Sequence, residues 1–190
     1  MTKLFGNLHL VLLVGLVLAI AVIVGFGPEV PVTVSSIFRW FHVFFGITWI
    51  GLLYYLNFVQ VPTMPSIPAE QKGAITGFIA PKVFFYFRYA ALLTVLTGLV
   101  IAIDAGYAHQ AFTFGGNRHV KLIGVGMYLA LVMAFNVWFI IWPAQKKILG
   151  IVEASAEEKA AAAPRALIAS RLNTLLSLPM LYCMVSANLG

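Results

Sequence analysis

The sequence predicts an all-α protein, a polytopic transmembrane helix bundle of about five spans. Of its 190 residues, 62% are hydrophobic and only 9% are charged. Apolar stretches about 20 residues long recur along the chain, and Pro-rich, Gly-rich or charged segments separate them. A soluble domain carries about 25% charged residues, so this chain is too poor in charge to cover a water-facing surface. Because the length suits one compact bundle, we treat residues 1–190 as a single domain.

Each span is assigned by its length, because about 20 apolar residues are needed to cross the hydrocarbon core of a membrane. The predicted spans are 8–26, 36–60, 83–105, 119–143 and 172–188. No small-residue cleavage pattern follows the first span, which predicts a retained helix and not a signal peptide. The fifth is the shortest and most polar, and an alternative with four spans places it at the membrane interface.

The two longest connections differ in composition. Residues 61–82 are Pro-rich and predict a loop made of turns. Residues 144–171 are Ala-rich with mixed charge, which favours a helix at or outside the headgroups. We expect Pro164 to break that helix, because proline lacks the N–H that the helix interior requires.

The basic residues fall unequally on the two sides of the membrane. Nine lie on the side of the N-terminus, namely Lys3, Lys72, Lys82, Arg88, Lys146, Lys147, Lys159, Arg165 and Arg171. Three lie on the other side, namely Arg39, Arg118 and Lys121. Because positive charge is retained in the cytoplasm, this bias predicts an N-terminus inside and a C-terminus outside. Topology thus explains the basic residues, and we predict no nucleic-acid binding.

Two histidines begin spans that descend from the same outer side. Arg39 precedes His42 by three residues, and Arg118 directly precedes His119. Two neutral imidazoles can ligate a haem iron axially, and guanidinium groups pair well with haem propionates. The pattern therefore predicts one b-type haem with His42 and His119 as metal ligands and the two arginines at the propionates. Gly46 lies one turn below His42 and would make room for the macrocycle.

Other interpretations of these residues remain open at this stage. His42 can instead hydrogen-bond across helices, with Thr97 or Tyr128 as partners at a similar depth. His119 can be a headgroup-level residue, and His109 can replace it as a ligand if its loop folds back. Two histidines without nearby carboxylates make a poor zinc or di-iron site. The single cysteine excludes a disulfide within the chain and a cysteine-based metal site.

Three stretches resemble one known family in its order along the chain. Residues 39–51 read RWFHVFFGITWIG, residues 118–149 read RHVKLIGVGMYLALVMAFNVWFIIWPAQKKIL, and residues 170–188 read SRLNTLLSLPMLYCMVSAN. They are similar to the membrane domain of bacterial urate hydroxylase-type proteins, also called the urate oxidase N-terminal domain. The resemblance implies intramembrane histidines at His42 and His119, a bacterial inner membrane location and a redox role. This sequence contains no CxxCH motif for a c-type haem.

Three functions follow from these observations. The first is one-electron transfer by a membrane-bound haem b protein near the periplasmic face, with a periplasmic cytochrome c or a respiratory or oxidase complex as partner. The second is a haem-free accessory subunit of a larger membrane complex. The third is purine (urate) oxidation together with a separate cytochrome c. We predict no catalytic residue, and the lipid bilayer is the expected surrounding.

Overall fold

The structure is a computed structural model that describes residues 2–26 and 32–187, and the regular secondary structure of these residues is entirely helical. In chain order the elements are α1 (Thr2–Phe5), α2 (Leu8–Phe26), α3 (Val34–Tyr54), η1 (Tyr55–Gln60), α4 (Val61–Thr63), η2 (Met64–Ser66), α5 (Ala69–Ala74), η3 (Ile75–Ile79), α6 (Ala80–Asp104), α7 (Ala108–Phe112), α8 (Arg118–Phe135), η4 (Asn136–Ile141), α9 (Trp142–Ile148) and α10 (Ala156–Ser186).

Consecutive elements join into five long helices, so the predicted number of spans is confirmed. Within the described residues, five helices are long and apolar enough to cross a membrane: 8–25, 34–66, 69–104, 118–148 and 156–186. Four of them are longer than their predicted spans and therefore reach beyond a 30 Å hydrocarbon core. The predicted end of the fifth span, residue 188, lies outside the described residues.

The prediction of a loop over 61–82 was wrong. Helical turns cover most of this segment, and the chain reverses only around Ile67 and Pro68. The reason lies in three π-helical turns, η1, η3 and η4, each of which ends two residues before a proline: Pro62, Pro81 and Pro143. A proline cannot donate a backbone hydrogen bond and its ring crowds the preceding turn. Widening that turn accommodates the ring, so the helix continues through the proline.

The predicted break at Pro164 was also wrong, because α10 runs without interruption through Pro164 and Pro179. Proline deprives the residue four positions earlier of its hydrogen-bond donor. For Pro164 that residue is Ala160, and both are exposed, so the freed carbonyl can be solvated. Solvation of this carbonyl reduces the free-energy cost of the proline, and the turns on either side keep the backbone of α10 helical.

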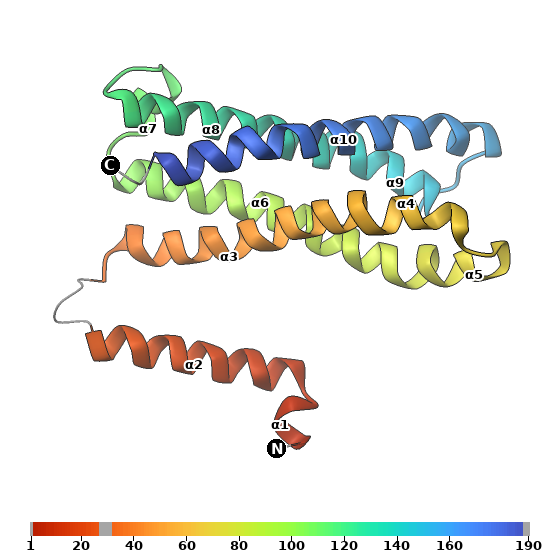
Figure 1. Cartoon of the computed structure of the whole chain (residues 1–190), viewed down its shortest axis with the longest axis horizontal. Helices are drawn as coiled ribbons and strands as arrows, with labels where there is room; N and C mark the ends of the chain where they lie inside the picture. Colours follow the sequence, from red (N-terminus) through yellow and green to blue (C-terminus); the bar gives the residue numbers. More distant parts are fainter. Residues whose placement is uncertain (1, 27–31, 188–190) are drawn as a thin grey trace.

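Four of the long helices form the bundle, as Figure 1 shows. α3 packs along α6, α8 packs along α10, and α10 also contacts α3, while α6 contacts α8. α3 and α8 therefore occupy diagonal positions. The fifth long helix, α2, lies apart from the others in Figure 1, and none of residues 8–25 is buried. A helix that is apolar on every side suits contact with lipid.

The core of the bundle is a cluster of large side chains between small ones. Trp49, Leu53, Phe87 and Met133 are fully buried. On α6 the small side chains of Ala90 and Ala91 are also buried, and they let α3 approach closely. Close approach matters in a membrane, because lipid solvates apolar side chains as well as other helices do and packing must drive association.

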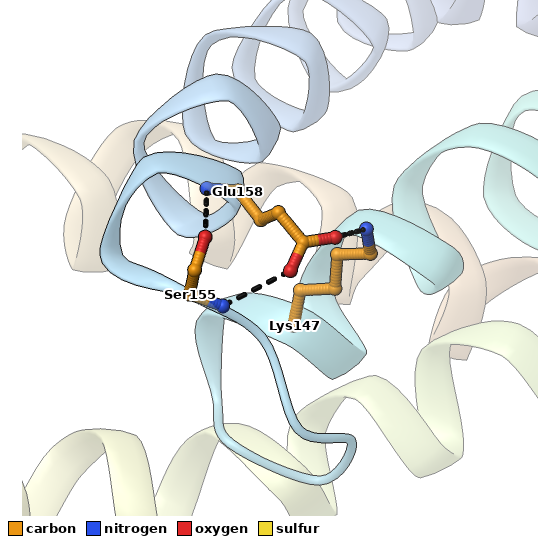
Figure 2. Close-up of polar contacts among 3 residues, drawn as sticks. All are labelled: Lys147, Ser155 and Glu158. Carbon is orange, nitrogen blue, oxygen red and sulfur yellow. Dashed lines mark hydrogen bonds and ion pairs between the residues drawn. The ribbon is translucent and has the colours of Figure 1, made fainter.

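The turn before α10 is closed by a capping box. Ser155 Oγ accepts a hydrogen bond from the backbone N–H of Glu158, and the Glu158 carboxylate accepts one from the N–H of Ser155. The same carboxylate forms an ion pair with Lys147 Nζ at 2.7 Å, as Figure 2 shows. These contacts tie the end of α9 to the start of α10 and satisfy N–H groups that the first helical turn leaves unpaired.

Candidate functional site

His42 lies in the third turn of α3, where α6 holds its imidazole. Its Nδ1 lies 2.8 Å from the carbonyl oxygen of Thr94 and 3.3 Å from Thr97 Oγ1. Because a carbonyl oxygen can only accept a hydrogen bond, Nδ1 carries the ring proton and donates a hydrogen bond to the Thr94 carbonyl oxygen. In the neutral ring Nε2 then keeps a lone pair that can accept a hydrogen bond or bind a metal. The hydrogen bond across helices, with Thr97 among its partners, matches one of the two interpretations of His42.

Gly98 allows the imidazole to lie against α6. It follows Thr94 by four residues, so both face α3 from the same side of their helix. A Cβ atom on Gly98 would lie 2.9 Å from His42 Cε1 and 3.2 Å from Nδ1. Any side chain at this position would therefore push the ring away from the Thr94 carbonyl.

The relative depth of these groups is fixed at the end of the bundle. The Asp104 carboxylate, at the end of α6, accepts hydrogen bonds from the backbone N–H and the hydroxyl of Ser35, at the start of α3. The negative charge of the Asp104 carboxylate also interacts favourably with the positive N-terminal end of the α3 helix dipole. The two helices run antiparallel, so His42, seven residues after Ser35, lies level with Thr97, seven residues before Asp104. The distance of 3.3 Å between His42 Nδ1 and Thr97 Oγ1 agrees with this register.

A cavity of about 50 Å³ lies beside His42 in the centre of the bundle. It is lined by residues of all four helices: His42, Trp49, Thr94, Val95, Gly98, Leu99, Met127, Ala130, Leu131, Met180 and Met184. Most of the wall is thus apolar, and three of its members are methionines. A space of this size holds a few water molecules.

The wall of this cavity includes a hydrogen-bond donor that lacks a partner. Trp49 is fully buried, and its Nε1 atom makes no hydrogen bond in the structure. Buried polar groups are almost always paired, so an unpaired indole N–H calls for an acceptor. His42 and Trp49 are seven residues apart on α3 and therefore face the core together, two turns apart.

The second predicted ligand lies elsewhere. His119 and Arg118 form the start of α8, where both are exposed, and Asn117 caps this helix by accepting a hydrogen bond from Val120 N–H at 3.0 Å. His119 does not line the cavity that contains His42. The structure therefore does not bring the two histidines into one site, and His109 is also exposed in α7.

The remaining predicted residues surround His42 at different distances. Arg39 is exposed one turn before it, and its charge reaches Tyr107 in the turn after α6. Burial raises the pKa of the Tyr107 hydroxyl, and the Arg39 charge partly offsets that rise. Gly46 faces α6, since a Cβ atom there would lie in ordinary contact with Thr94 Cγ2 at 3.9 Å. It is not among the residues that line the cavity. In the described part of the chain, no three His, Cys, Asp or Glu residues gather as a metal site.

A layer of buried amides further along the bundle was largely missed by the sequence analysis. Asn136 Nδ2 donates to Asn173 Oδ1 at 2.9 Å, and Asn173 Nδ2 donates to the Met133 carbonyl at 2.9 Å. Asn57 Nδ2 donates to Ser170 Oγ at 2.8 Å. The available signal is that Asn57, Asn136 and Asn173 each lie in a different predicted span, in apolar surroundings. Their hydrogen bonds tie α10 to α8 and η4, and to η1, which continues α3.

Arg88 lies inside the span of α6, where aromatic rings surround its guanidinium group. Its Cζ lies 3.8 Å from the ring centroid of Trp142 and 5.0 Å from that of Tyr89. The Trp138 indole N–H donates to the Arg88 carbonyl at 3.1 Å. Cation–π contacts of this kind stabilise a charge that lipid would not solvate.

Comparison with known proteins identifies the family but no individual relative. No curated protein and no solved structure matched the chain. A family model described as urate oxidase N-terminal matches residues 82–190. The matched range contains Thr94, Gly98 and the three methionines of the cavity and begins after His42. Because it covers more than half of the chain, the protein belongs to the urate oxidase N-terminal family.

Proposed function

We propose that this protein is a membrane-bound electron-transfer subunit that holds one b-type haem through His42. The observation that carries the proposal is the fixed imidazole, with Nδ1 donating to the Thr94 carbonyl at 2.8 Å and Nε2 left as the available lone pair. Metal-binding histidines usually donate their other ring N–H to a carbonyl or carboxylate, which fixes the tautomer and orients the ring. The family match supports a redox role.

The donor chemistry of the site fits a haem iron. Imidazole nitrogen and methionine thioether are both common axial ligands, and the cavity beside His42 is lined by methionines of α8 and α10. Gly98 leaves open the space that a side chain would take from the ring. Arg39, one turn nearer the end of the bundle, is the remaining predicted partner for a propionate. When bound, the haem would supply a one-electron couple.

The size of the cavity sets a condition on binding. About 50 Å³ is far less than a macrocycle occupies, so haem can enter only if the helices around His42 move apart. The methionines favour such movement, because their unbranched side chains adapt to a changed space. We therefore expect the haem-bound bundle to be wider at the level of His42 than the structure described here.

The location of His42 agrees with exchange of electrons at one membrane surface. It lies nearer the end of the bundle where α3 begins and α6 ends. The distribution of basic residues predicts that this end faces the periplasm. A haem held there would be within reach of a periplasmic cytochrome c or of another subunit of a respiratory or oxidase complex.

Replacing His42 with alanine tests the proposal directly. Protein purified from haem-replete membranes is expected to show a Soret band, and a sharp α band after reduction with dithionite, because a ligated haem absorbs there. The His42→Ala variant is expected to lose both bands, whereas His109→Ala, which removes an exposed imidazole, retains them. A wild-type protein without these bands, or unchanged bands in His42→Ala, would contradict haem ligation by His42.

Placing a methyl group on Gly98 provides a second test that leaves His42 in the chain. The Gly98→Ala variant is expected to lose most of its haem, because the new Cβ displaces the ring from the Thr94 carbonyl. Gly46→Ala is the matched control, since its Cβ meets only an ordinary contact at 3.9 Å. Haem content per protein, from the absorbance ratio of the Soret band to the protein band, checks both. Equal haem content in the two variants would contradict the role given to Gly98.

A second candidate function is a haem-free accessory subunit of a larger membrane complex. It is favoured by the contacts that already satisfy His42 Nδ1 and by the small volume of the cavity. In that case His42 only joins α3 to α6, and the purified protein is colourless. A third, purine oxidation with a separate cytochrome c, is supported by the family match alone. Urate consumption by membranes with and without the protein distinguishes it from the first two.

A further inference from the structure

We propose that Arg88 and the groove between α6 and α8 bind one acidic phospholipid, with the headgroup phosphate at Arg88 and an acyl chain in the groove. This inference goes beyond the proposed electron-transfer function and does not depend on it. Among the described residues no carboxylate pairs with Arg88, and the ion pair present is that of Lys147 with Glu158. Arg88 Nε is also buried and makes no hydrogen bond. A charge inside a span is costly without a partner, so an anion is expected beside Arg88.

The aromatic rings around Arg88 leave its guanidinium group able to bind a phosphate. Its Cζ lies over the Trp142 ring, 3.8 Å from the centroid, and 6.0 Å from the centroid of Trp138. Contact through the face of the guanidinium group leaves the N–H groups at its edge free, and these match two phosphate oxygens at once. Arg88 is half-buried, and its neighbours Phe85 and Tyr89 are exposed, so this edge can be reached from the lipid.

The depth of Arg88 suits a lipid headgroup. Two exposed charges on α6, Asp104 and Lys82, are 22 residues or about 33 Å apart, close to the thickness of the hydrocarbon core. Arg88 lies only six residues, or about 9 Å, from Lys82. Side chains of a helix lean towards its N-terminus, so Arg88 extends towards that nearer surface. Lys146, one turn after Trp142 on α9, adds a second positive charge there, and basic pockets between spans favour acidic headgroups.

An apolar groove leads from Arg88 towards the middle of the membrane. Its volume is about 740 Å³, and it is lined by Leu92, Val95, Leu131, Val132, Ala134, Phe135, Trp138 and Phe139. Trp138 lies at the Arg88 end, because its indole N–H donates to the Arg88 carbonyl at 3.1 Å. Seven residues along each antiparallel helix, or about 10 Å further, Leu131 lies opposite Val95. An acyl chain attached to a headgroup at Arg88 would follow this path, which a free phosphate ion would leave empty.

The test places the full-length protein in phosphatidylcholine bilayers that contain a small fraction of lipid with brominated acyl chains, which quench tryptophan fluorescence on contact. Trp138 and Trp142 both flank Arg88, and a Trp40→Phe background removes an exposed tryptophan at the other end of the bundle. Brominated phosphatidylglycerol is compared with brominated phosphatidylcholine at the same fraction. We expect an apparent affinity about fivefold higher for phosphatidylglycerol, the effect of one basic residue near a membrane surface.

Three variants test the two halves of the site. Arg88→Gln is expected to lose the preference for phosphatidylglycerol, whereas Arg165→Gln, which removes an exposed charge from α10, retains it. Val132→Phe changes an exposed residue of the groove and leaves the charges in place, so weaker quenching by phosphatidylglycerol is expected. Helical circular dichroism establishes that each variant is folded.

Several outcomes would overturn the proposal. Equal quenching of the wild type by the two lipids would show that the site does not select an acidic headgroup. A preference that survives in Arg88→Gln, or that is lost to the same extent in Arg165→Gln, would show that overall charge attracts the lipid. Unchanged quenching in Val132→Phe would remove the acyl chain from the groove.

Discussion

Replacing Gly124 with alanine is expected to destabilise the folded bundle by about 1–3 kcal/mol, because the new methyl group has no space. Its Cβ would overlap the Ala111 carbonyl oxygen and lie 3.1 Å from the Ala111 carbonyl carbon. Both atoms are backbone atoms of α7, so no side-chain rotation can relieve the contact. The Tyr128 hydroxyl donates to the Phe112 carbonyl at 2.8 Å and keeps α7 against α8. We therefore expect α7 to be displaced.

The measurement is the unfolding of purified protein in mixed detergent micelles, followed by helical circular dichroism as the denaturing detergent is increased. The matched control is Gly51→Ala, because nothing lies within 4 Å of its added Cβ. In a helix, alanine is preferred to glycine by up to about 1 kcal/mol, so the control is expected to be as stable as the parent or slightly more so. Equal stability of the two variants would show that α7 can move aside without cost.

The course of the chain across the membrane was predictable because it depends on local properties. Length and hydropathy set each span, and neither requires knowledge of the neighbouring helices. The errors occurred at prolines. The rule that proline ends a helix assumes that the series of backbone hydrogen bonds must stop there. Instead, Pro62, Pro81 and Pro143 each follow a widened π-helical turn, and the helix continues. Widening costs one irregular turn and preserves the long helix, which a membrane favours over an open loop.

The site was predictable only in part, because it depends on the register between helices. His42 was predicted as a site residue because it lies deep within an apolar span. Its contact with Thr97 was one of the predicted alternatives, because the two residues lie at a similar depth on neighbouring helices. His119 was matched to it because both begin spans from the same side. α8 begins only at Arg118, so His119 remains at the rim while the ring of His42 lies two turns deeper. The predicted spans 36–60 and 119–143 already place His42 six residues inside its span and His119 at the first residue of its own, so this difference in depth could be predicted from the sequence. The contacts of His42 with α6 could not, because they depend on how the helices pair.

Replacing Asn173 with leucine is expected to destabilise the bundle by about 1–3 kcal/mol, through the loss of its hydrogen-bonding amide. Asn173 is fully buried, accepts a hydrogen bond from Asn136 and donates one to the Met133 carbonyl. Leucine has a similar size, so the main change is that the Asn136 amide N–H stays buried without an acceptor. Within hydrocarbon or a packed core no water replaces that acceptor.

The sign of the coupling between the two asparagines separates this cause from a packing defect. When both partners become apolar, no donor is left unpaired, so Asn136→Leu/Asn173→Leu is expected to be more stable than the sum of the two single losses predicts. Thr174→Val is the matched control, because its hydroxyl bonds only to the Ser170 carbonyl of its own helix. The same detergent unfolding series measures all four variants. Strict additivity of the two single changes would mean that the amides act independently, and the buried pair would then contribute only through the space that it fills.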